Sequence, residues 1–339
     1  MTKSKRLDIS LSNCCQLRCP KCPSGRRGFS LADENEYMKF EDFRSLLDGN
    51  PQIKEVLTNC RGEMFLNPDL LQIMEYAFKK GVAMGNSCGV NLNNVNEGVL
   101  EGLVKYRFRL LLCSLDGASP ETYSTYRIGG DFNKVIEHIR TINHFKKTYK
   151  SEYPKLIWQF IVFGYNEHEI DAAKEMAREL NMEFSPKMQT NPGQAFSSIR
   201  NREMVMKKTG WSVTTREEFA EKTGSEYIRS VCHSLWLGPR VDWDGTITGC
   251  GCFRKNQGAF GGNALVDGYL SAITHEKIEY AKKMLLGQEK PKDNIPCTTC
   301  QLYLDMRNSK NFLTLKEIFQ SPLPEYKWMP FSCKMTFLE

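Results

Sequence analysis

The chain has 339 residues, of which 41% are hydrophobic and 25% charged, and its formal net charge is +6. This composition is typical of a globular protein with room for one large or two modest domains, and it excludes a disordered or low-complexity chain. The charge is mild and the basic clusters at 3–6 and 26–27 are short, so nucleic acid is not an expected partner.

The sequence also indicates the cellular compartment of the protein. No apolar run approaches the roughly 20 residues that span a bilayer, and residues 1–12 lack the apolar core of a signal peptide. We therefore expect a cytoplasmic protein without a membrane partner. Thirteen cysteines, an odd number in a chain with no export signal, argue against a disulfide framework and favour metal ligation by thiolates.

Short aliphatic runs alternate with amphipathic stretches from about residue 6 to residue 190, which predicts a parallel sheet with crossover helices. The six predicted strands are 7–12, 55–59, 82–87, 110–116, 156–162 and 182–186. The predicted helices include 40–47, 70–80, 96–105, 132–149 and 167–180. Asp131 is the expected cap of the fourth of these helices, whose apolar residues form one stripe.

Chemically reactive side chains follow four successive predicted strands. A cysteine triplet follows the first, residues 61–63 follow the second, Cys88 and Gly89 follow the third, and residues 114–117 close the fourth. Ligands of parallel α/β proteins gather at the carboxyl ends of the strands. The sequence therefore predicts a functional site at that edge.

The triplet Cys15, Cys19 and Cys22 has a C-x3-C-x2-C spacing. Three thiolates in one short loop can hold three irons of a four-iron cluster and leave the fourth iron open. A zinc knuckle or a structural thiolate cluster is the alternative. Cys14 is a poor fourth ligand because the side chains of adjacent residues diverge.

The motif and its setting resemble the radical S-adenosylmethionine (radical SAM) enzymes, in which the amino and carboxylate groups of the cofactor chelate the open iron. The resemblance implies a partial (β/α)6 TIM-type barrel, a SAM-binding 4Fe-4S cluster on Cys15, Cys19 and Cys22, and S-adenosylmethionine as cofactor. Residues 61–69 look like the Gly-Gly-Glu element of that family, with Arg61 in place of the first glycine.

That element implies cofactor-binding roles. Gly62 would let the backbone approach the cofactor, and Glu63 would bind the ammonium group of the cofactor. The stretch 114–132 is similar to the fourth-strand region of the family, which implies that Ser114 contacts the cofactor and Arg127 pairs with its carboxylate. The ordinary alternatives are that Glu63 is an exposed loop acid, that Ser114 is a buried hydroxyl bonded to the backbone, and that Arg127 forms a salt bridge on a helix surface.

Residues 86–89 stand where relatives often have Thr-Asn-Gly before the adenosine site, and Cys88 replaces the asparagine. The sequence therefore does not predict which contact, if any, residue 88 makes with the cofactor.

Cysteines become frequent again after a connector, 195–231, that is rich in Arg, Lys, Glu and Thr. This second set resembles the auxiliary-cluster extensions of radical SAM enzymes. The resemblance implies one further 4Fe-4S cluster, with Cys232, Cys250, Cys297 and Cys300 as ligands. A structural zinc ion is the alternative.

Met306 and Lys310 stand where the two-cluster SPASM type would have more cysteines, so we predict the shorter twitch type. Cys333 is a weaker ligand candidate. Residues 241–245 predict a hairpin with an Asp-Gly turn.

Cys252 follows Cys250 by two residues, so on an extended strand both would point to one face. It is an alternative ligand, a buried thiol or a donor of a hydrogen atom to a substrate radical, which would make the enzyme an epimerase. We expect Cys60 and Cys113 to pack in the barrel.

The predicted organisation is a barrel at 1–194, the connector at 195–231, a small cysteine-rich α+β auxiliary-cluster domain at 232–305 and a tail at 306–339. The resemblance implies reductive cleavage of S-adenosylmethionine to a 5′-deoxyadenosyl radical, abstraction of hydrogen from a substrate, and a reducing partner such as flavodoxin or ferredoxin. The auxiliary cluster would transfer an electron.

The substrate is the least constrained part of the prediction. Because the barrel begins within ten residues of Met1 and leaves no room for a leader-peptide-binding domain, we expect dehydrogenation or epimerisation of a small polyhydroxylated sugar or aminocyclitol. A SPASM-type peptide or protein maturase is the alternative within the enzymes. A non-catalytic metal-binding or electron-transfer protein is the alternative of another class.

Overall fold

The structure is a computed structural model, and it describes residues 5–26, 36–58, 61–86, 88–189, 196–250 and 259–320. The chain divides into two compact units, which we describe separately. Unit 1 comprises residues 1–11, 38–57 and 228–339, and unit 2 comprises residues 12–37 and 58–227. The predicted domain boundaries stay a prediction, because this division groups residues by packing rather than by function.

Unit 2 holds the middle of the predicted α/β region. Its strands are β3 (Ala83–Asn86), β4 (Leu110–Ser114), β5 (Lys155–Val162) and β6 (Met182–Met188). Its helices are α1 (Pro23–Arg26), α3 (Leu70–Lys79), α4 (Glu97–Lys105), α5 (Pro120–Tyr126), α6 (Phe132–Thr148), α7 (Ile170–Glu179), α8 (Arg202–Thr209) and α9 (Arg216–Thr223). Short 3-10 turns lie at Met64–Leu66 and Glu167–Glu169.

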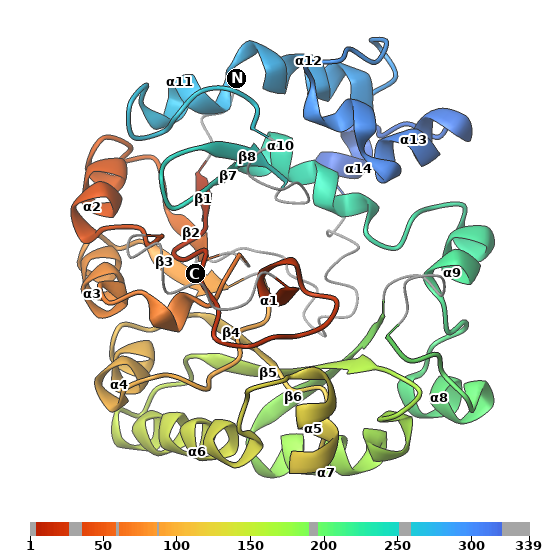
Figure 1. Cartoon of the computed structure of the whole chain (residues 1–339). Coiled ribbons are helices and arrows are strands. Elements are labelled where there is room, and N and C mark those ends of the chain that lie inside the picture. Colours follow the sequence, from red (N-terminus) through yellow and green to blue (C-terminus); the bar gives the residue numbers. More distant parts are fainter. Residues whose placement is uncertain are drawn as a thin grey trace. The chain divides into compact units, whose positions relative to one another are not determined.

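The central sheet of unit 2 is parallel, with the order β4-β5-β6. β3 adjoins β4, where a parallel bridge links Val90 to Cys113. Trp158 and Phe160 of β5 are completely buried. Figure 1 shows α6 and α7 along the lower side of this sheet and α1 with the cysteine loop above it. Ser114 is the last residue of β4 and pairs with Gln159 in the middle of β5, so two polar side chains meet at the carboxyl end of β4.

Helix α6 confirms the prediction from its sequence pattern. The Asp131 side chain accepts a hydrogen bond from the Lys134 backbone N–H, as expected of an N-cap. Four residues of the apolar stripe are buried: Val135, Ile136, Ile139 and Ile142. The helix therefore forms because a capped start and one continuous apolar face agree.

Unit 1 contains the first strand and the C-terminal segment. Its strands are β1 (Arg6–Ile9), β2 (Glu55–Thr58, whose last residue is assigned to unit 2), β7 (Arg240–Val241) and β8 (Ile247–Gly249). Its helices are α2 (Phe40–Asp48), α10 (Ser234–Leu237), α11 (Tyr269–Ile273), α12 (Glu276–Leu285), α13 (Gln301–Asn308) and α14 (Leu315–Gln320). Short 3-10 turns lie at Arg229–His233 and Pro296–Thr299.

In the sheet of unit 1, β1 lies between β2 and β7 and runs parallel to β7, with Ile9 opposite Val241. β7 and β8 form the predicted hairpin: the Gly245 N–H donates to Asp242 O at 2.9 Å, and Gly245 has a φ of +82°. Glycine suits that turn because it adopts a left-handed conformation without strain.

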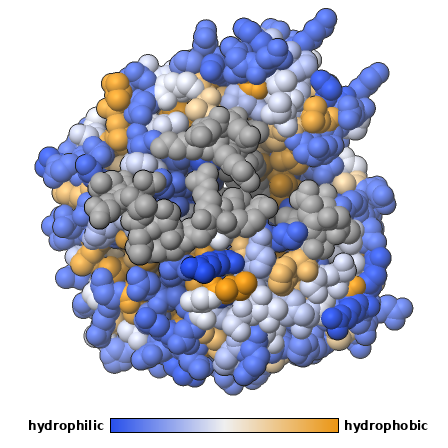
Figure 2. Space-filling view, viewed as in Figure 1, coloured by the Kyte–Doolittle hydropathy of each residue, from blue (hydrophilic) through white to orange (hydrophobic). Residues whose placement is uncertain are grey.

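The described residues form no large apolar patch on the face that Figure 2 shows. Hydrophilic side chains prevail over the helices there, and hydrophobic ones occur in small groups. Small apolar groups of this kind are normal on globular proteins. Among the residues that the structure describes, no helix has both the length and the apolar character needed to cross a bilayer.

A half-buried titratable group, Glu55, lies at the start of β2. Burial raises the pKa of the Glu55 carboxyl to about 7, against the lowering effect of Arg6, and the Asp8 carboxylate adds to the rise. Arg6 is bound to Asp8, with 2.7 Å between Nε and Oδ1. Ionised Glu55 is therefore a cost to the folded state at neutral pH.

We expect Glu55→Gln to stabilise the protein at pH 8 by on the order of 2 kcal/mol, and to change little at pH 5. The folded pKa lies above the ordinary value of 4.5, so the proton favours the folded state at low pH and that contribution is lost as pH rises through 7. Thermal melts at both pH values measure the effect. Exposed Glu137→Gln is the control, and an equal gain at pH 5 and pH 8 contradicts this account.

Candidate functional site

The cysteine triplet lies in a partly buried loop of unit 2. Cys19 is buried, Cys15 and Cys22 are half-buried, and the Cys22 N–H donates to Cys19 O at 3.1 Å. Burial raises the pKa of the Cys15 thiol to about 12, and the Glu63 carboxylate and the other two thiols add to the rise. Thiols that oppose one another's ionisation favour a cationic metal centre, which stabilises all three thiolates and releases their protons.

Aromatic side chains surround this loop. Leu17, Cys19, Tyr126 and Phe163 form one buried cluster, against which Cys15, Cys22, Tyr165 and Phe196 pack. The rings of Tyr126 and Phe163 are 4.9 Å apart, and those of Tyr126 and Phe196 are 5.2 Å apart. This cluster covers Cys19 and partly covers Cys15 and Cys22, and electrostatic interactions are stronger where water is partly excluded.

Glu63 is buried rather than exposed, with 3% of its surface accessible. One carboxylate oxygen accepts from the Asn91 N–H at 2.6 Å and the other from the Phe65 N–H at 3.3 Å. Burial raises the pKa of Glu63 to about 7, against the lowering effect of these two hydrogen bonds. Its position beside Cys15 suits a group that receives an ammonium ion next to the cysteine loop.

Asn91 is a candidate residue that our sequence reasoning missed. Its side-chain amide lies 3.7 Å from Cys15 Sγ, and its backbone N–H binds Glu63. The Asn91 Oδ1 also accepts from the Gln16 side chain at 3.0 Å. Asn91 thus links the cysteine loop to the predicted ammonium site. The only signal in the sequence is its place after the third strand, among several asparagines.

Arg127 lies beside the cysteine loop, but its main partner in the structure is a protein carboxylate. Its Nε and Nη2 donate to Asp116 Oδ2 at 2.7 and 2.6 Å, and its Nη1 lies 3.8 Å from Cys19 Sγ. The Asp116 side chain is completely buried and that of Arg127 is 13% exposed, so this is no helix-surface salt bridge. Arginine has five N–H donors, and these contacts use three of them.

Ser114 and Gly89 lie in contact at the end of β4. Ser114 is buried, and a Cβ added to Gly89 would be only 1.9 Å from Ser114 Oγ and 3.2 Å from Gln159 Oε1. Gln159 Oε1 is a buried acceptor that has no hydrogen-bond partner among the described residues. Gln159, which the sequence shows only as an interruption of an apolar run, is therefore a second missed candidate.

The remaining cysteines of this region have other environments. Cys113 is fully buried and its Sγ lies 3.7 Å from Leu111 O, in agreement with a packing role. Cys88 is disulfide-bonded, which the argument against disulfides did not anticipate. Cys60, Cys252 and Cys333 lie outside the described residues, so their predicted roles stay predictions.

The second cysteine set lies in unit 1. Cys232, Cys250 and Cys297 are buried, and Cys300 is half-buried as the N-cap of α13. Burial raises the pKa of the Cys297 thiol far above its usual range, and Cys250 and Cys300 add to the rise. These three predicted ligands are therefore close enough to interact electrostatically, and Cys232 lies in the turn Arg229–His233.

The donor sets of both sites consist of thiols, which suit an iron–sulfur cluster or a zinc ion. Within the described ranges, no three His, Cys, Asp or Glu side chains come together in a way that could hold a single metal ion. A four-iron cluster distributes its thiolates over separate irons instead, and soft thiolates are its usual ligands. The thiols and the donors aimed at them therefore fit an iron–sulfur cluster in unit 2.

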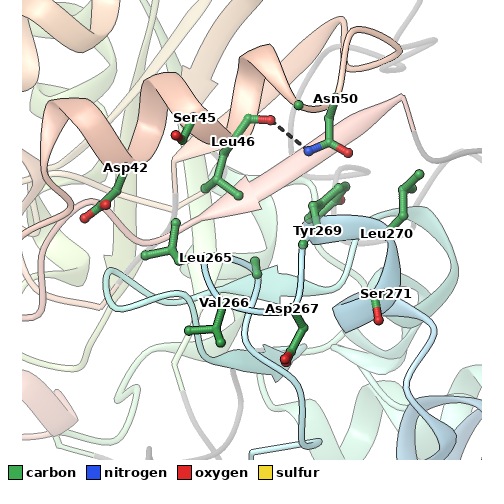
Figure 3. A pocket seen from close by; sticks show the side chains of 13 residues that line it. Asp42, Ser45, Leu46, Asn50, Leu265, Val266, Asp267, Tyr269, Leu270 and Ser271 are labelled. Carbon is green, nitrogen blue, oxygen red and sulfur yellow. Dashed lines mark hydrogen bonds between the residues drawn. The ribbon is translucent and has the colours of Figure 1, made fainter.

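A separate cavity of about 540 Å³ lies in unit 1 (Figure 3). One wall is α2 with the turn after it, where the Asn50 side chain donates to Leu46 O at 2.8 Å, and the other wall is the segment 264–271. Asp42 and Asp267 contribute carboxylates from the two walls. No predicted ligand cysteine is among its lining residues, so it is distinct from the candidate metal sites.

Comparison with known proteins identifies the fold. No protein-family model and no curated protein sequence matches this chain. Among solved structures, it is similar to SuiB of Streptococcus suis bound to S-adenosylmethionine, with 13% identity, 88% of this chain and 71% of that chain covered, and a TM-score of 0.62.

It is also similar to anSMEcpe with bound AdoMet and the Cp18Cys peptide, with 16% identity, 95% and 96% of the two chains covered, and a TM-score of 0.57. A third match is SuiB bound to its precursor peptide SuiA, with 13% identity, 90% and 71% covered, and a TM-score of 0.57.

Both neighbours are radical SAM enzymes of the SPASM or twitch type. The chain described here therefore shares the fold of these radical SAM enzymes. This confirms the fold class predicted from the cysteine motifs and the alternating strands and helices.

Proposed function

We propose that the chain is a radical SAM enzyme with a 4Fe-4S cluster on Cys15, Cys19 and Cys22. The observation that carries the proposal is that three thiols of one loop in unit 2 are near enough to interact electrostatically, and that Asn91 and Arg127 direct donors at two of them, Cys15 and Cys19. When bound, the cluster and S-adenosylmethionine supply one-electron cleavage to methionine and a 5′-deoxyadenosyl radical, which abstracts hydrogen from a substrate.

In this proposal, the residues of the chain bind and orient the cofactor and shield the reacting groups from water. Glu63 is held by two backbone N–H groups and accepts the ammonium group of the cofactor. Ser114 and Gln159 Oε1, which has no hydrogen-bond partner among the described residues, offer hydrogen-bonding groups at the carboxyl end of β4. The aromatic side chains packed on the cysteine loop would limit the access of water to the reacting groups.

The second cysteine set would hold an auxiliary 4Fe-4S cluster on Cys232, Cys250, Cys297 and Cys300. A cluster with four protein ligands has no open iron for a substrate, so its task would be electron transfer. The reducing partner would be a flavodoxin or ferredoxin. Metal analysis of anaerobically purified protein tests this step: we expect about eight irons per chain, and about four irons with one zinc would remove the second cluster.

The substrate is either a small polyhydroxylated molecule, which we expected from the sequence, or a peptide. The comparisons give the peptide specific support, because the matched structures of SuiB and anSMEcpe include complexes with peptides. The mass of the product separates the reaction types: loss of two hydrogens indicates dehydrogenation or crosslinking, and an unchanged mass indicates epimerisation.

Epimerisation would give Cys252 its role as hydrogen donor, and a Cys252→Ala variant that still epimerises normally would remove it.

The non-catalytic alternative makes a different prediction. A metal-binding or electron-carrying protein has no need of an ammonium-binding acid at Glu63, so it predicts no binding of S-adenosylmethionine and no cleavage. Cysteine-dependent cleavage of the cofactor therefore separates the two classes.

A further inference from the structure

The contacts of Arg127 point to a task that the family resemblance does not assign. The resemblance gives Arg127 to the carboxylate of the cofactor. In the structure its fork is bound to Asp116 and its Nη1 is directed at the sulfur of Cys19. A hydrogen bond from a cation to a thiolate ligand stabilises the reduced, more negative state of a cluster.

Asp116 is fixed by several independent contacts. Its Oδ1 accepts from the Ile161 N–H at 2.8 Å, and its backbone oxygen accepts from the Asn166 side chain at 3.0 Å. Its Oδ2 accepts hydrogen bonds from the Nε and Nη2 groups of Arg127. A carboxylate held in this way leaves the guanidinium little freedom, so it determines where Nη1 lies.

We propose that Arg127 donates a hydrogen bond to the Cys19 ligand of the cluster, and that Asp116 is the positioning residue that holds it there. The inference rests on the proposed function, because it concerns the same cluster. Arg127 then assists reduction of the cluster in the absence of the cofactor, whatever it contributes to binding the cofactor afterwards.

The experiment measures the reduction potential of the N-terminal cluster without S-adenosylmethionine, by titration monitored with electron paramagnetic resonance. The auxiliary signal is recorded separately in the Cys15→Ala/Cys19→Ala/Cys22→Ala variant and subtracted. We expect Arg127→Met to shift the potential to more negative values, and Arg127→Lys, which keeps the charge but loses the fork, to shift it less. Arg202→Met removes an exposed arginine of the same unit and should leave the potential unchanged.

Asp116→Asn tests the positioning role in two backgrounds. With Arg127 present, the released guanidinium should move the potential in the negative direction. In the Arg127→Met background there is no guanidinium to release, so Asp116→Asn only removes a negative charge. The reduction potential should then move in the positive direction. Equal shifts in both backgrounds overturn the positioning role. Should Arg127→Met fail to assemble the cluster, Arg127→Lys carries the test of the hydrogen bond.

The outcomes separate this inference from the proposed function. A wild-type potential in both Arg127→Met and Arg127→Lys, combined with weaker binding of S-adenosylmethionine, assigns Arg127 to the cofactor alone and overturns the inference. If the wild type shows no cluster signal beyond that of the triple-cysteine variant, the proposed function itself fails.

Discussion

Replacing Glu63 by glutamine is expected to weaken the binding of S-adenosylmethionine to the anaerobically reconstituted protein by about 100-fold. Two losses add. The ammonium group loses its charged acceptor, and an amide has only one carbonyl oxygen for the two backbone N–H groups that Glu63 accepts. Equilibrium dialysis with labelled cofactor measures the change.

Glu167→Gln is a matched control for this variant. Glu167 is also a buried carboxylate of unit 2 that accepts two backbone N–H groups, from Arg200 and Asn201. We expect Glu167→Gln to bind the cofactor as the wild type does. If Glu63→Gln binds it within twofold of the wild type while retaining its iron, Glu63 is not the ammonium site.

The second large effect is expected from Gly62→Ala, which should lose the N-terminal cluster. Gly62 has a φ of +70°, and an added Cβ would be 2.5 Å from Cys14 O, a backbone atom that cannot move alone. The same loop ties Glu63 to the cysteine segment, because the Glu63 N–H donates to Cys14 O at 2.6 Å. We expect the iron content to fall by about four per chain, measured by colorimetric assay.

Gly81→Ala separates backbone strain from the loss of space. Gly81 has a similar φ of +68°, but nothing lies within 4 Å of an added Cβ. This variant should be mildly destabilised and should keep its full iron content. Equal iron loss in Gly62→Ala and Gly81→Ala would mean that the close approach to the cysteine loop has no special importance.

Much of the fold was predictable from the sequence because local patterns and tertiary packing agree in unit 2. The predicted strand 110–116 corresponds to Leu110–Ser114, and the predicted helix 132–149 to Phe132–Thr148. The short helices of unit 1 were not predicted, because segments such as Ser234–Leu237 are too short to show an apolar period.

The candidate site was predictable where spacing along the chain carries the information. The cysteine triplet and the residues after each strand are of this kind. The pairing of Arg127 with Asp116 was not, because both residues are polar and only the folded chain shows that one binds the other. Asn91 and Gln159 were missed for a similar reason: an asparagine in a loop and a glutamine in a strand are informative only once their contacts are known.

The central claim is that the three cysteines of the N-terminal loop support reductive cleavage of S-adenosylmethionine. The most direct measurement is chromatographic detection of 5′-deoxyadenosine after anaerobic reconstitution and dithionite reduction, with the wild type and the Cys15→Ala/Cys19→Ala/Cys22→Ala variant compared. We predict 5′-deoxyadenosine from the wild type and none from the variant. No 5′-deoxyadenosine from a wild-type protein with its clusters fully loaded would contradict the claim and favour a metal-binding or electron-carrying protein.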